Sequence, residues 1–298
     1  MTVDTARPQA AAALRQVIGS SRPISWINTA YPFAAAYLMV ARHVDLTLVV
    51  GTVYFLVPYN LLMYGINDVF DYESDLRNPR KGGIEGVVLS RRWHRLTLWS
   101  AGLSNVPFLV YLLAVGSPAA RLTLVISVLA VVAYSAPRLR FKERPVLDSL
   151  TSSTHFVSPA VLGLVIAGGT ASAAVVATVA AFFLWGVASQ AFGAVQDVTA
   201  DRAASIASIA TWLGARRTVR FAMTGYALSA VAMLGAGWPG GLAAVIPLGY
   251  LASVAPFRGL TDEGCEAANR GWRRFLWLNL VSGFLVTQLL IWIAIRSR

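Results

Sequence analysis

Aspartates recur at regular spacings at two places in an otherwise apolar sequence. The first cluster reads Asn67-Asp68-Val-Phe-Asp71-Tyr-Glu-Ser-Asp75. At 100° per residue, the three aspartates at i, i+3 and i+7 lie within about 60° of one another on one helix face, and Glu73 points nearly the opposite way. Like charges at this spacing repel, so the stripe needs a compensating cation. Because carboxylate oxygens suit Mg²⁺, the cluster predicts a magnesium site.

The second cluster consists of Asp197 and Asp201, which stand four residues apart at the end of a later apolar stretch. This spacing again places both carboxylates on one helix face. Gln190, one heptad before Asp197, continues that face into the membrane, where a polar group usually marks a functional cavity. Either cluster alone could be a solvated helix end, but two clusters favour one shared site. An EF-hand is excluded because its glycine and distal glutamate are missing.

Basic residues accompany both clusters. Arg77, Arg80 and Lys81 follow the first, and Arg202 follows the second. Magnesium held by carboxylates normally completes its shell with water and substrate phosphate. Acidic helix ends with basic loops nearby therefore predict a clamp for a diphosphate. The predicted metal ligands are Asp68, Asp71, Asp75, Asp197 and Asp201, of which all but Asp75 are also assigned to catalysis.

A third basic segment, residues 134–145, reads Tyr-Ser-Ala-Pro-Arg-Leu-Arg-Phe-Lys-Glu-Arg-Pro. Pro137 and Pro145 argue against a continuous helix. Tyr134 and Ser135, where the preceding helix meets this loop, could donate hydrogen bonds to phosphate. The alternative is an ordinary basic cytoplasmic loop. In an extended chain, alternate residues share one side, which would bring together Arg138, Arg140, Lys142 and Arg144.

The composition predicts the elements that must position these residues. Of 298 residues, 56% are hydrophobic and only 13% are charged, about half the charge of a soluble domain. A membrane protein is therefore expected. The net charge of +11 fits Lys and Arg collected in cytoplasmic loops, so we expect no nucleic-acid partner. The single cysteine, Cys265, excludes a disulfide framework, and the scattered histidines His43, His94 and His155 argue against a histidine metal site.

We predict an all-α polytopic membrane protein, with a polar cytoplasmic tail at 1–23 and one nine-helix domain at 24–298. The tail contains an amphipathic segment around Ala10–Ile18. The expected spans are 24–42, 46–66, 95–116, 121–136, 150–168, 172–195, 218–236, 239–256 and 274–295.

Charge placement predicts the orientation of these spans. Alternate polar segments, beginning with the N-terminus, hold 21 of the 25 Lys and Arg residues. The positive-inside rule then places the N-terminus and the aspartate clusters in the cytoplasm and the C-terminus outside the cell membrane. Of the 14 acidic residues, only Asp45 falls on the outer side. The orientation rule does not explain this second bias, so the acids need a functional cause.

With these motifs in place, the sequence resembles the UbiA superfamily of intramembrane prenyltransferases. The first cluster matches that family's N-D-x-x-D-x-x-x-D pattern at each specified position, and Asp197 and Asp201 match its D-x-x-x-D. Nine spans and a cytoplasmic site also fit, so the resemblance covers nearly the whole chain. It implies a Mg²⁺-dependent transferase with a prenyl diphosphate donor and a lipophilic acceptor.

Within the superfamily, residues 134–148, the opening Arg22-Pro-Ile-Ser-Trp-Ile-Asn-Thr and the Ser208-Ile-Ala-Thr stretch look like the carotenoid branch, the lycopene elongases. After the first cluster the chain runs Asn78-Pro-Arg-Lys-Gly-Gly-Ile-Glu, which departs from the Arg-Pro-Ile segment usual in quinone-pathway members. This departure weakens an aromatic-acid acceptor. The resemblance and the basic loops together give a diphosphate-binding set of Asn67, Arg77, Lys81, Tyr134, Ser135, Arg138, Arg140, Lys142 and Arg22.

The resemblance implies transfer of a C5 unit from dimethylallyl diphosphate to lycopene. Apolar and aromatic walls would exclude water from the allylic cation. The candidate wall residues are Tyr64, Phe70, Phe141 and Phe192, and the alternative for each is ordinary packing. The alternatives are a quinone precursor, a chlorophyll-type alcohol or a glycerol phosphate as acceptor. A multi-pass transporter is a rival of another class, but it would place polar groups near mid-membrane on broken helices. The sequence gives no signal for oligomeric state.

Overall fold

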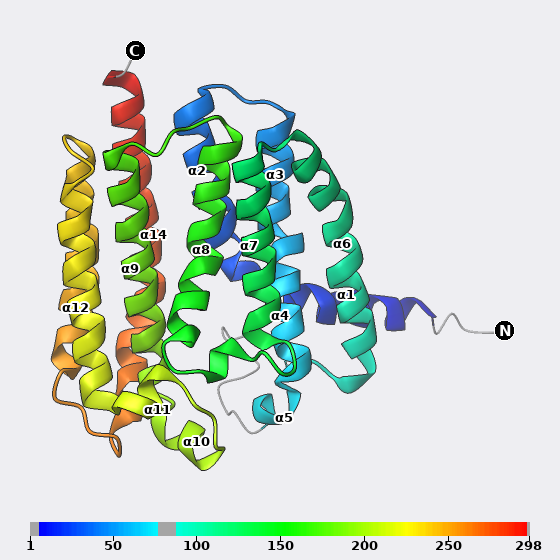
Figure 1. The fold of residues 1–298 in the computed structure, drawn as a ribbon. Coiled ribbons are helices and arrows are strands. Elements are labelled where there is room, and N and C mark those ends of the chain that lie inside the picture. The colour runs from blue at the N-terminus through cyan, green and yellow to red at the C-terminus, as the bar shows by residue number, and fades with distance from the viewer. Residues whose placement is uncertain (1–5, 77–87, 297–298) are drawn as a thin grey trace. The chain divides into compact units, whose positions relative to one another are not determined.

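The computed structural model describes residues 6–76 and 88–296, and over these residues the chain is helical with no strand, which confirms the expected all-α class (Figure 1). The chain divides into two compact units, and one long helix, α8 (Leu147–Ile166), contributes to both. The first unit comprises Met1–Leu139 and Ser158–Ala167, and the second comprises Arg140–Val157 and Gly168–Arg298.

The first unit is built from seven helices besides its part of α8. Figure 1 shows α1 lying across the other helices of this unit rather than alongside them. Asp45 caps α3 by accepting a hydrogen bond from the Leu48 N–H at 2.9 Å. The helices are α1 (Ala6–Ser20), α2 (Ile27–Ala41), α3 (Leu46–Leu56), α4 (Pro58–Phe70), α5 (Tyr72–Asp75), α6 (His94–Val115) and α7 (Pro118–Ser135).

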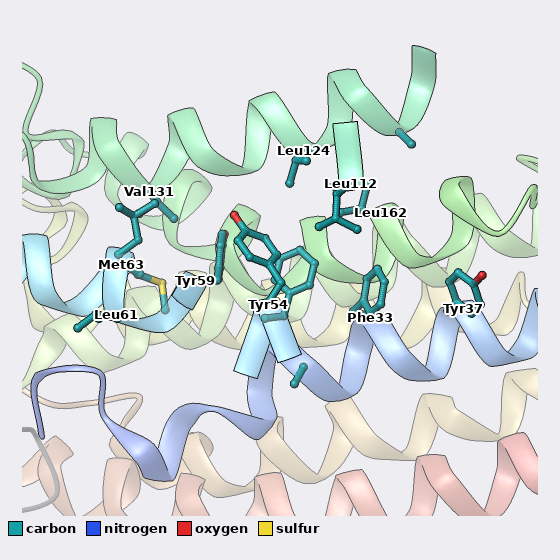
Figure 2. Close-up of a cluster of buried hydrophobic side chains, with 14 of the residues drawn as sticks. Phe33, Tyr37, Tyr54, Tyr59, Leu61, Met63, Leu112, Leu124, Val131 and Leu162 are labelled. Atoms are coloured by element: carbon teal, nitrogen blue, oxygen red, sulfur yellow. The ribbon is translucent and has the colours of Figure 1, made fainter. Parts of the chain in front are cut away.

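Aromatic side chains fill the core of the first unit, as Figure 2 shows for the residues around Tyr54 and Tyr59. The rings of Phe33 and Phe55 lie 5.3 Å apart, and those of Phe55 and Tyr59 lie 5.0 Å apart. A Cβ at Gly51 would stand only 2.1 Å from the Phe33 ring, so α2 and α3 approach closely because this position has no side chain. In lipid such packing replaces the hydrophobic effect as the force between helices.

The second unit contains the remaining helices. Ser172 caps α9, and Ser208 and Thr211 form a capping box at the start of α11. Short 3₁₀ turns form at Phe141–Glu143, before α8, and at Ala255–Phe257, at the end of the helix Val245–Val254. The helices are α9 (Ala173–Val195), α10 (Val198–Ala203), α11 (Ile209–Leu213), α12 (Ala215–Leu234), α13 (Val245–Val254) and α14 (Asn269–Arg296), with 3₁₀ segments at Gly240–Ala244 and Cys265–Ala268.

Small residues form the seam between α9 and α12, which run side by side in Figure 1. A Cβ built at Gly225 would lie 2.9 Å from the Cβ of Ala188. The Ser229 hydroxyl donates to the Ala181 carbonyl at 2.7 Å, and Ser189 and Tyr226 share a hydrogen bond of 3.0 Å. Close backbone approach with hydroxyls as interhelical donors is the usual way in which membrane helices associate.

Seven helical stretches within the described residues are long and apolar enough to cross a membrane. They correspond to seven of the nine expected spans, with α3 and α4 together forming one of them, Leu46–Phe70. The other two expected spans coincide with α2, which has 15 residues, and with α12, whose first turns carry Arg216, Arg217 and Arg220. Nine transmembrane spans therefore stay a prediction.

Candidate active site

The first aspartate cluster begins in α4 and ends in α5. A single helix was expected, but α4 stops at Phe70 and α5 starts at Tyr72, so the helix is divided at Asp71. Helical hydrogen bonding nevertheless continues across this point. The Asp71 N–H donates to the Asn67 carbonyl at 2.9 Å, and the Asp75 N–H donates to the Asp71 carbonyl at 2.8 Å. Successive aspartates therefore still follow one another by about one turn.

Asp68 is the most enclosed member of this cluster. Its side chain is 0% exposed, and its Oδ1 accepts a hydrogen bond at 3.3 Å from the guanidinium of Arg22, which is 21% exposed. The guanidinium also lies over the Tyr64 ring, 4.4 Å from its centroid. Burial is the largest influence on Arg22 and lowers its pKa, but the charge and hydrogen bond of Asp68, together with the nearby Tyr64 and Asp75, outweigh it and raise the pKa above its usual value. The predicted cation Arg22 and the predicted ligand Asp68 thus form an ion pair.

The backbone at Arg22 supports this placement. Arg22 follows the end of α1 and has φ of 50°, in the left-handed region that costs energy for a residue with a side chain. Its N–H donates to the Gly19 carbonyl at 3.1 Å, which fixes the turn. A strained residue held at a charged cluster is a pattern typical of functional sites.

Asn67 is held from the end of α7. The Ser135 hydroxyl, fully buried, donates to the Asn67 Oδ1 at 2.9 Å. Two residues that were predicted to bind diphosphate therefore contact each other within the first unit. Tyr134 is half-buried and Arg138 is exposed in the same unit.

The basic loop after α7 does not adopt the extended conformation that we expected. Its prolines do end the helix, as predicted, but residues Phe141–Glu143 form a 3₁₀ turn, and Arg138 and Arg140 have φ of 74° and 39°. A chain with these left-handed residues cannot place alternate side chains on one side, so that prediction is wrong. Arg140 instead forms a two-pronged ion pair with Glu143, and this bond lowers the pKa of the Glu143 carboxyl.

The second aspartate cluster follows a similar break in the helix. α9 ends at Val195, Asp197 precedes the first residue of α10, and the Asp201 N–H donates to the Asp197 carbonyl at 2.8 Å. Asp197 and Asp201 are therefore one helical turn apart, as predicted. Gln190 belongs to α9, so the single continuous helix face that we expected from Gln190 to Asp201 is interrupted at Gln196.

Gln196 itself ties this break to the start of α14. Its side-chain oxygen accepts from the Asn269 amide at 2.6 Å, and its carbonyl accepts from the Cys265 thiol at 3.6 Å. Cys265 is fully buried, as an incidental thiol would be. These contacts hold the second cluster against the segment between α13 and α14.

Arg202 makes contacts that the sequence did not predict. Its guanidinium donates to Asp262 at 2.6 Å and to the Thr211 carbonyl at 2.9 Å, so it joins three segments of the second unit. Asp262 also accepts from the Ala215 N–H at 2.6 Å. That backbone bond and Arg202 lower the pKa of the Asp262 carboxyl. The sequence did not single out Asp262, because its partner Arg202 lies 60 residues earlier in the chain.

Asp148 is a further residue that sequence reasoning missed. It is fully buried at the start of α8, where it accepts from the N–H groups of Ser149 at 2.7 Å and Ile209 at 2.8 Å. The second bond connects α8 to α11, just beyond the second aspartate cluster. A signal did exist: Asp148, Thr151, Ser152 and His155 repeat at three- or four-residue intervals inside an apolar span, which is unusual in a membrane helix.

Gln190 contacts that polar stripe. The Ser152 hydroxyl donates to its Oε1 at 2.9 Å, and Gln190 is half-buried. The amide predicted to mark a cavity is therefore paired with a hydroxyl of α8 within the second unit. Phe192, a candidate wall residue two positions later, is enclosed by Phe257 and the backbone of Gly271, which fits the packing alternative.

The donor chemistry of both clusters fits magnesium. All five predicted ligands supply carboxylate oxygens, and Asn67 adds an amide oxygen. Among the described residues, no three acidic, histidine or cysteine side chains come together as a closed metal site. Mg²⁺ does not require one, since it usually keeps several waters and binds through one or two carboxylates plus phosphate oxygens.

The predicted residues divide between the two units and the undescribed part of the chain. Arg77, Lys81 and their neighbour Arg80 lie outside the described residues. The first unit holds Arg22, Asn67, Asp68, Asp71, Asp75, Tyr134, Ser135 and Arg138, and the second holds Arg140, Lys142, Asp197 and Asp201. Each unit thus contains one aspartate cluster and part of the basic loop.

Sequence relatives point to one family. The profile of the UbiA prenyltransferase family matches residues 29–280. A "lycopene elongase/hydratase" from Corynebacterium glutamicum is 54% identical over 278 residues, which cover 93% of this chain and 97% of that protein. A "C(50) beta-cyclic carotenoids biosynthesis protein" from Dietzia sp. is 56% identical over 96% of this chain, and the match spans 66% of its length. A lycopene elongase/hydratase from Haloferax volcanii is 33% identical over 91% of this chain and 87% of its own.

Solved structures share the fold. A UbiA homologue from Archaeoglobus fulgidus bound to DMAPP and Mg²⁺ superimposes with a TM-score of 0.65 at 17% identity, covering 90% of this chain and 98% of that one. A digeranylgeranylglyceryl phosphate synthase gives a TM-score of 0.65 at 13% identity, covering 92% and 98%. With two aspartate motifs at helix ends, a match along most of the sequence and the shared fold, this chain belongs to the UbiA prenyltransferase family.

Proposed function

We propose that this prenyltransferase transfers a C5 unit from dimethylallyl diphosphate to lycopene, as a step toward C50 carotenoids. The observation that carries the choice of acceptor is the 54% identity to a lycopene elongase/hydratase along 97% of that protein's length. A match of this kind extends through the spans that would enclose an acceptor, and is not confined to the aspartate motifs. The orientation that we propose, from the distribution of Lys and Arg, puts the diphosphate site at the cytoplasmic face of the cell membrane.

Both aspartate clusters act on the same diphosphate in this proposal. The residues that would hold bound Mg²⁺ are the carboxylates of Asp68, Asp71, Asp75, Asp197 and Asp201, and the metal would neutralise charge on the leaving diphosphate. Arg22 has a second task. Once a cation neutralises the Asp68 carboxylate, the guanidinium would be available to donate to diphosphate oxygens. Ser135 keeps the Asn67 amide oriented.

The bond changes follow from this arrangement. The allylic C–O bond breaks, both electrons leave with the diphosphate, and an allylic cation remains. The terminal double bond of the acceptor attacks that cation, which forms a C–C bond and a new carbocation. Loss of a proton or addition of water then ends the reaction. Because the acceptor is uncharged, its pocket needs no fixed ion, which agrees with spans rich in Ala, Gly, Val and Leu.

Polar groups of the second unit provide a place where that last step could occur. Gln190 and Ser152 form a hydrogen-bonded pair within the spans, and the polar stripe of α8 continues from them to Asp148. Such groups hold water in an apolar environment better than the surrounding side chains do. They could orient a single water molecule toward the carbocation.

Membranes that contain the protein provide the test. They are supplied with dimethylallyl diphosphate and Mg²⁺ and are offered lycopene and 4-hydroxybenzoate in parallel, with pigment masses as the readout. We expect C45 and C50 products from lycopene, and none with Asp68→Ala or Asp197→Ala. Prenylated hydroxybenzoate with unchanged lycopene would move the chain to a quinone-type acceptor and leave the diphosphate site in place. Absence of any Mg²⁺-dependent diphosphate release would refute the diphosphate site as well.

A further inference from the structure

A cavity of about 560 Å³ lies in the second unit, between the segment after α13 and the start of α14. Its walls combine apolar side chains with two arginines, and no acid of the described part of the chain lines it. The lining residues are Pro256, Phe257, Gly259, Leu260, Ala267, Arg270 and Arg274. The volume falls in the range of sites for small ligands. None of these residues belongs to the aspartate clusters or to the diphosphate-binding set.

Charge favours an anion in this cavity. Arg270 and Arg274 are one helical turn apart, so their guanidiniums extend from the same face of α14. Arg270 also lies in the first turn of this 28-residue helix, where the helix dipole favours negative charge. The acids near this segment have other positions: Asp262 binds Arg202, and Glu263 and Glu266 are exposed and do not line the cavity.

The same face of α14 becomes apolar immediately beyond the arginines. At 100° per residue, Trp277, Val281 and Phe284 lie within about 80° of Arg270 and Arg274. Their exposed fractions are 73%, 52% and 63%, so they face outward from the unit. From Arg274 to Phe284 the helix rises about 15 Å, which is half the hydrocarbon thickness of a bilayer.

We propose that this cavity binds the phosphate headgroup of an anionic phospholipid whose acyl chains lie along the Trp277–Phe284 face of α14. The pattern of two arginines above an outward apolar face matches a lipid in one leaflet, with the headgroup at the interface and the tails beside the helix. Basic pockets at the cytoplasmic ends of membrane helices bind anionic lipids in this way. A free phosphate or diphosphate would use the arginines but leave the apolar face without a role.

The cavity also adjoins the second aspartate cluster through named contacts. Asn269, the first residue of α14, donates to Gln196, which directly precedes Asp197. A lipid that steadies the start of α14 therefore steadies the helix break that positions Asp197. The inference depends on the membrane embedding of the chain and not on the identity of the acceptor.

Lipid retention on the full-length protein tests the proposal without any turnover. The protein is reconstituted in nanodiscs of phosphatidylcholine with phosphatidylglycerol, extracted, and analysed for bound lipid by native mass spectrometry. A basic residue near a membrane surface contributes about 1 kcal/mol, or roughly a fivefold change in affinity, so Arg270→Gln with Arg274→Gln should lower phosphatidylglycerol retention about 25-fold. Arg216→Gln with Arg217→Gln, which removes two exposed arginines elsewhere in the unit, should leave it unchanged.

A steric variant makes the test independent of charge. A Cβ built at Gly259 meets no atom within 4 Å, so Gly259→Leu should narrow the cavity without disturbing the fold and should also weaken lipid binding. Gly249→Leu, at a glycine with equally open surroundings outside the cavity, is its control. Equal phosphatidylglycerol retention by the wild type and by both the arginine and Gly259 variants would overturn the proposal. So would arginine-dependent binding of inorganic diphosphate, measured by thermal shift, without phosphatidylglycerol retention.

Discussion

Neutralising Arg22 and Asp68 separately and together distinguishes a structural ion pair from a catalytic one. Removing one partner of a fully buried pair costs about 3–5 kcal/mol, because the other charge stays buried. Here Arg22 is 21% exposed and the N–O distance is 3.3 Å, so we expect the lower end, about 3 kcal/mol for Arg22→Gln or Asp68→Asn. For a chain of this size that corresponds to a fall in Tm of about 5 °C.

The double variant separates the two roles. With both charges gone, no buried ion is left unpaired, so much of the lost Tm should return. Activity should not return. If Arg22 contacts the leaving diphosphate, its loss removes a charged contact of the transition state and lowers kcat by about 100-fold or more, and the loss of Asp68 removes a metal ligand as well. Diphosphate release and Tm in detergent are the two measurements.

An exposed pair in the same unit supplies the matched control. Arg91 and Glu73 form an ion pair whose side chains are 70% and 65% exposed. Neutralising either partner should change Tm by less than about 2 °C, because surface pairs contribute little. Recovery of kcat in the Arg22→Gln, Asp68→Asn double variant would show that turnover needs neither the Arg22 contact with diphosphate nor the Asp68 carboxylate as a metal ligand, and both roles would then be wrong.

Four further outcomes follow from the structure. Asp197→Ala should abolish turnover while the protein still inserts, and chelation of Mg²⁺ should do the same to the wild type; near-normal rates in either case would rule out the metal clamp. Asp148→Leu removes the acceptor of two buried N–H groups and should cost about 1–3 kcal/mol of stability, visible as a lower Tm than in Thr154→Ala, where an exposed hydroxyl is lost. Gly51→Leu should prevent folding, since its Cβ would overlap the Phe33 ring, and a well-folded variant would contradict the packing. A reporter fused after Arg298 should be active only outside the cytoplasm, and cytoplasmic activity would refute the nine-span topology.

Periodic features of the site could be read from the sequence. The spacing of Asp68, Asp71 and Asp75 and of Asp197 and Asp201 is a local property, because one helical turn joins residues three or four apart. Length and apolarity likewise predicted the long helices. The breaks at Asp71 and Gln196 were not predictable, since neither position carries the proline or glycine that usually interrupts a helix.

Pairings between residues far apart in the chain could not be predicted from the sequence, for a different reason. Arg202 looked like a diphosphate ligand because it follows Asp201, but its partner Asp262 is 60 residues away and becomes a neighbour only through the fold. The extended conformation predicted for the basic loop was wrong for a local reason. Alternation predicted four basic side chains on one side, whereas Phe141–Glu143 form a 3₁₀ turn in which Arg140 pairs with the nearby Glu143.

The seam between α9 and α12 restricts how this sequence can drift over evolutionary time. A methyl group added at position 225 would lie 2.9 Å from the Cβ of Ala188, well inside van der Waals contact, so alanine at 225 is compatible with this backbone only if position 188 becomes glycine. Among close descendants we therefore expect either glycine at 225 with alanine at 188, or alanine at 225 with glycine at 188. Exposed positions on the same helix, such as Leu228 and Val231, are 52% and 66% exposed and should vary independently. A designer who wishes to stabilise the enzyme should leave the seam unchanged and alter its outer face.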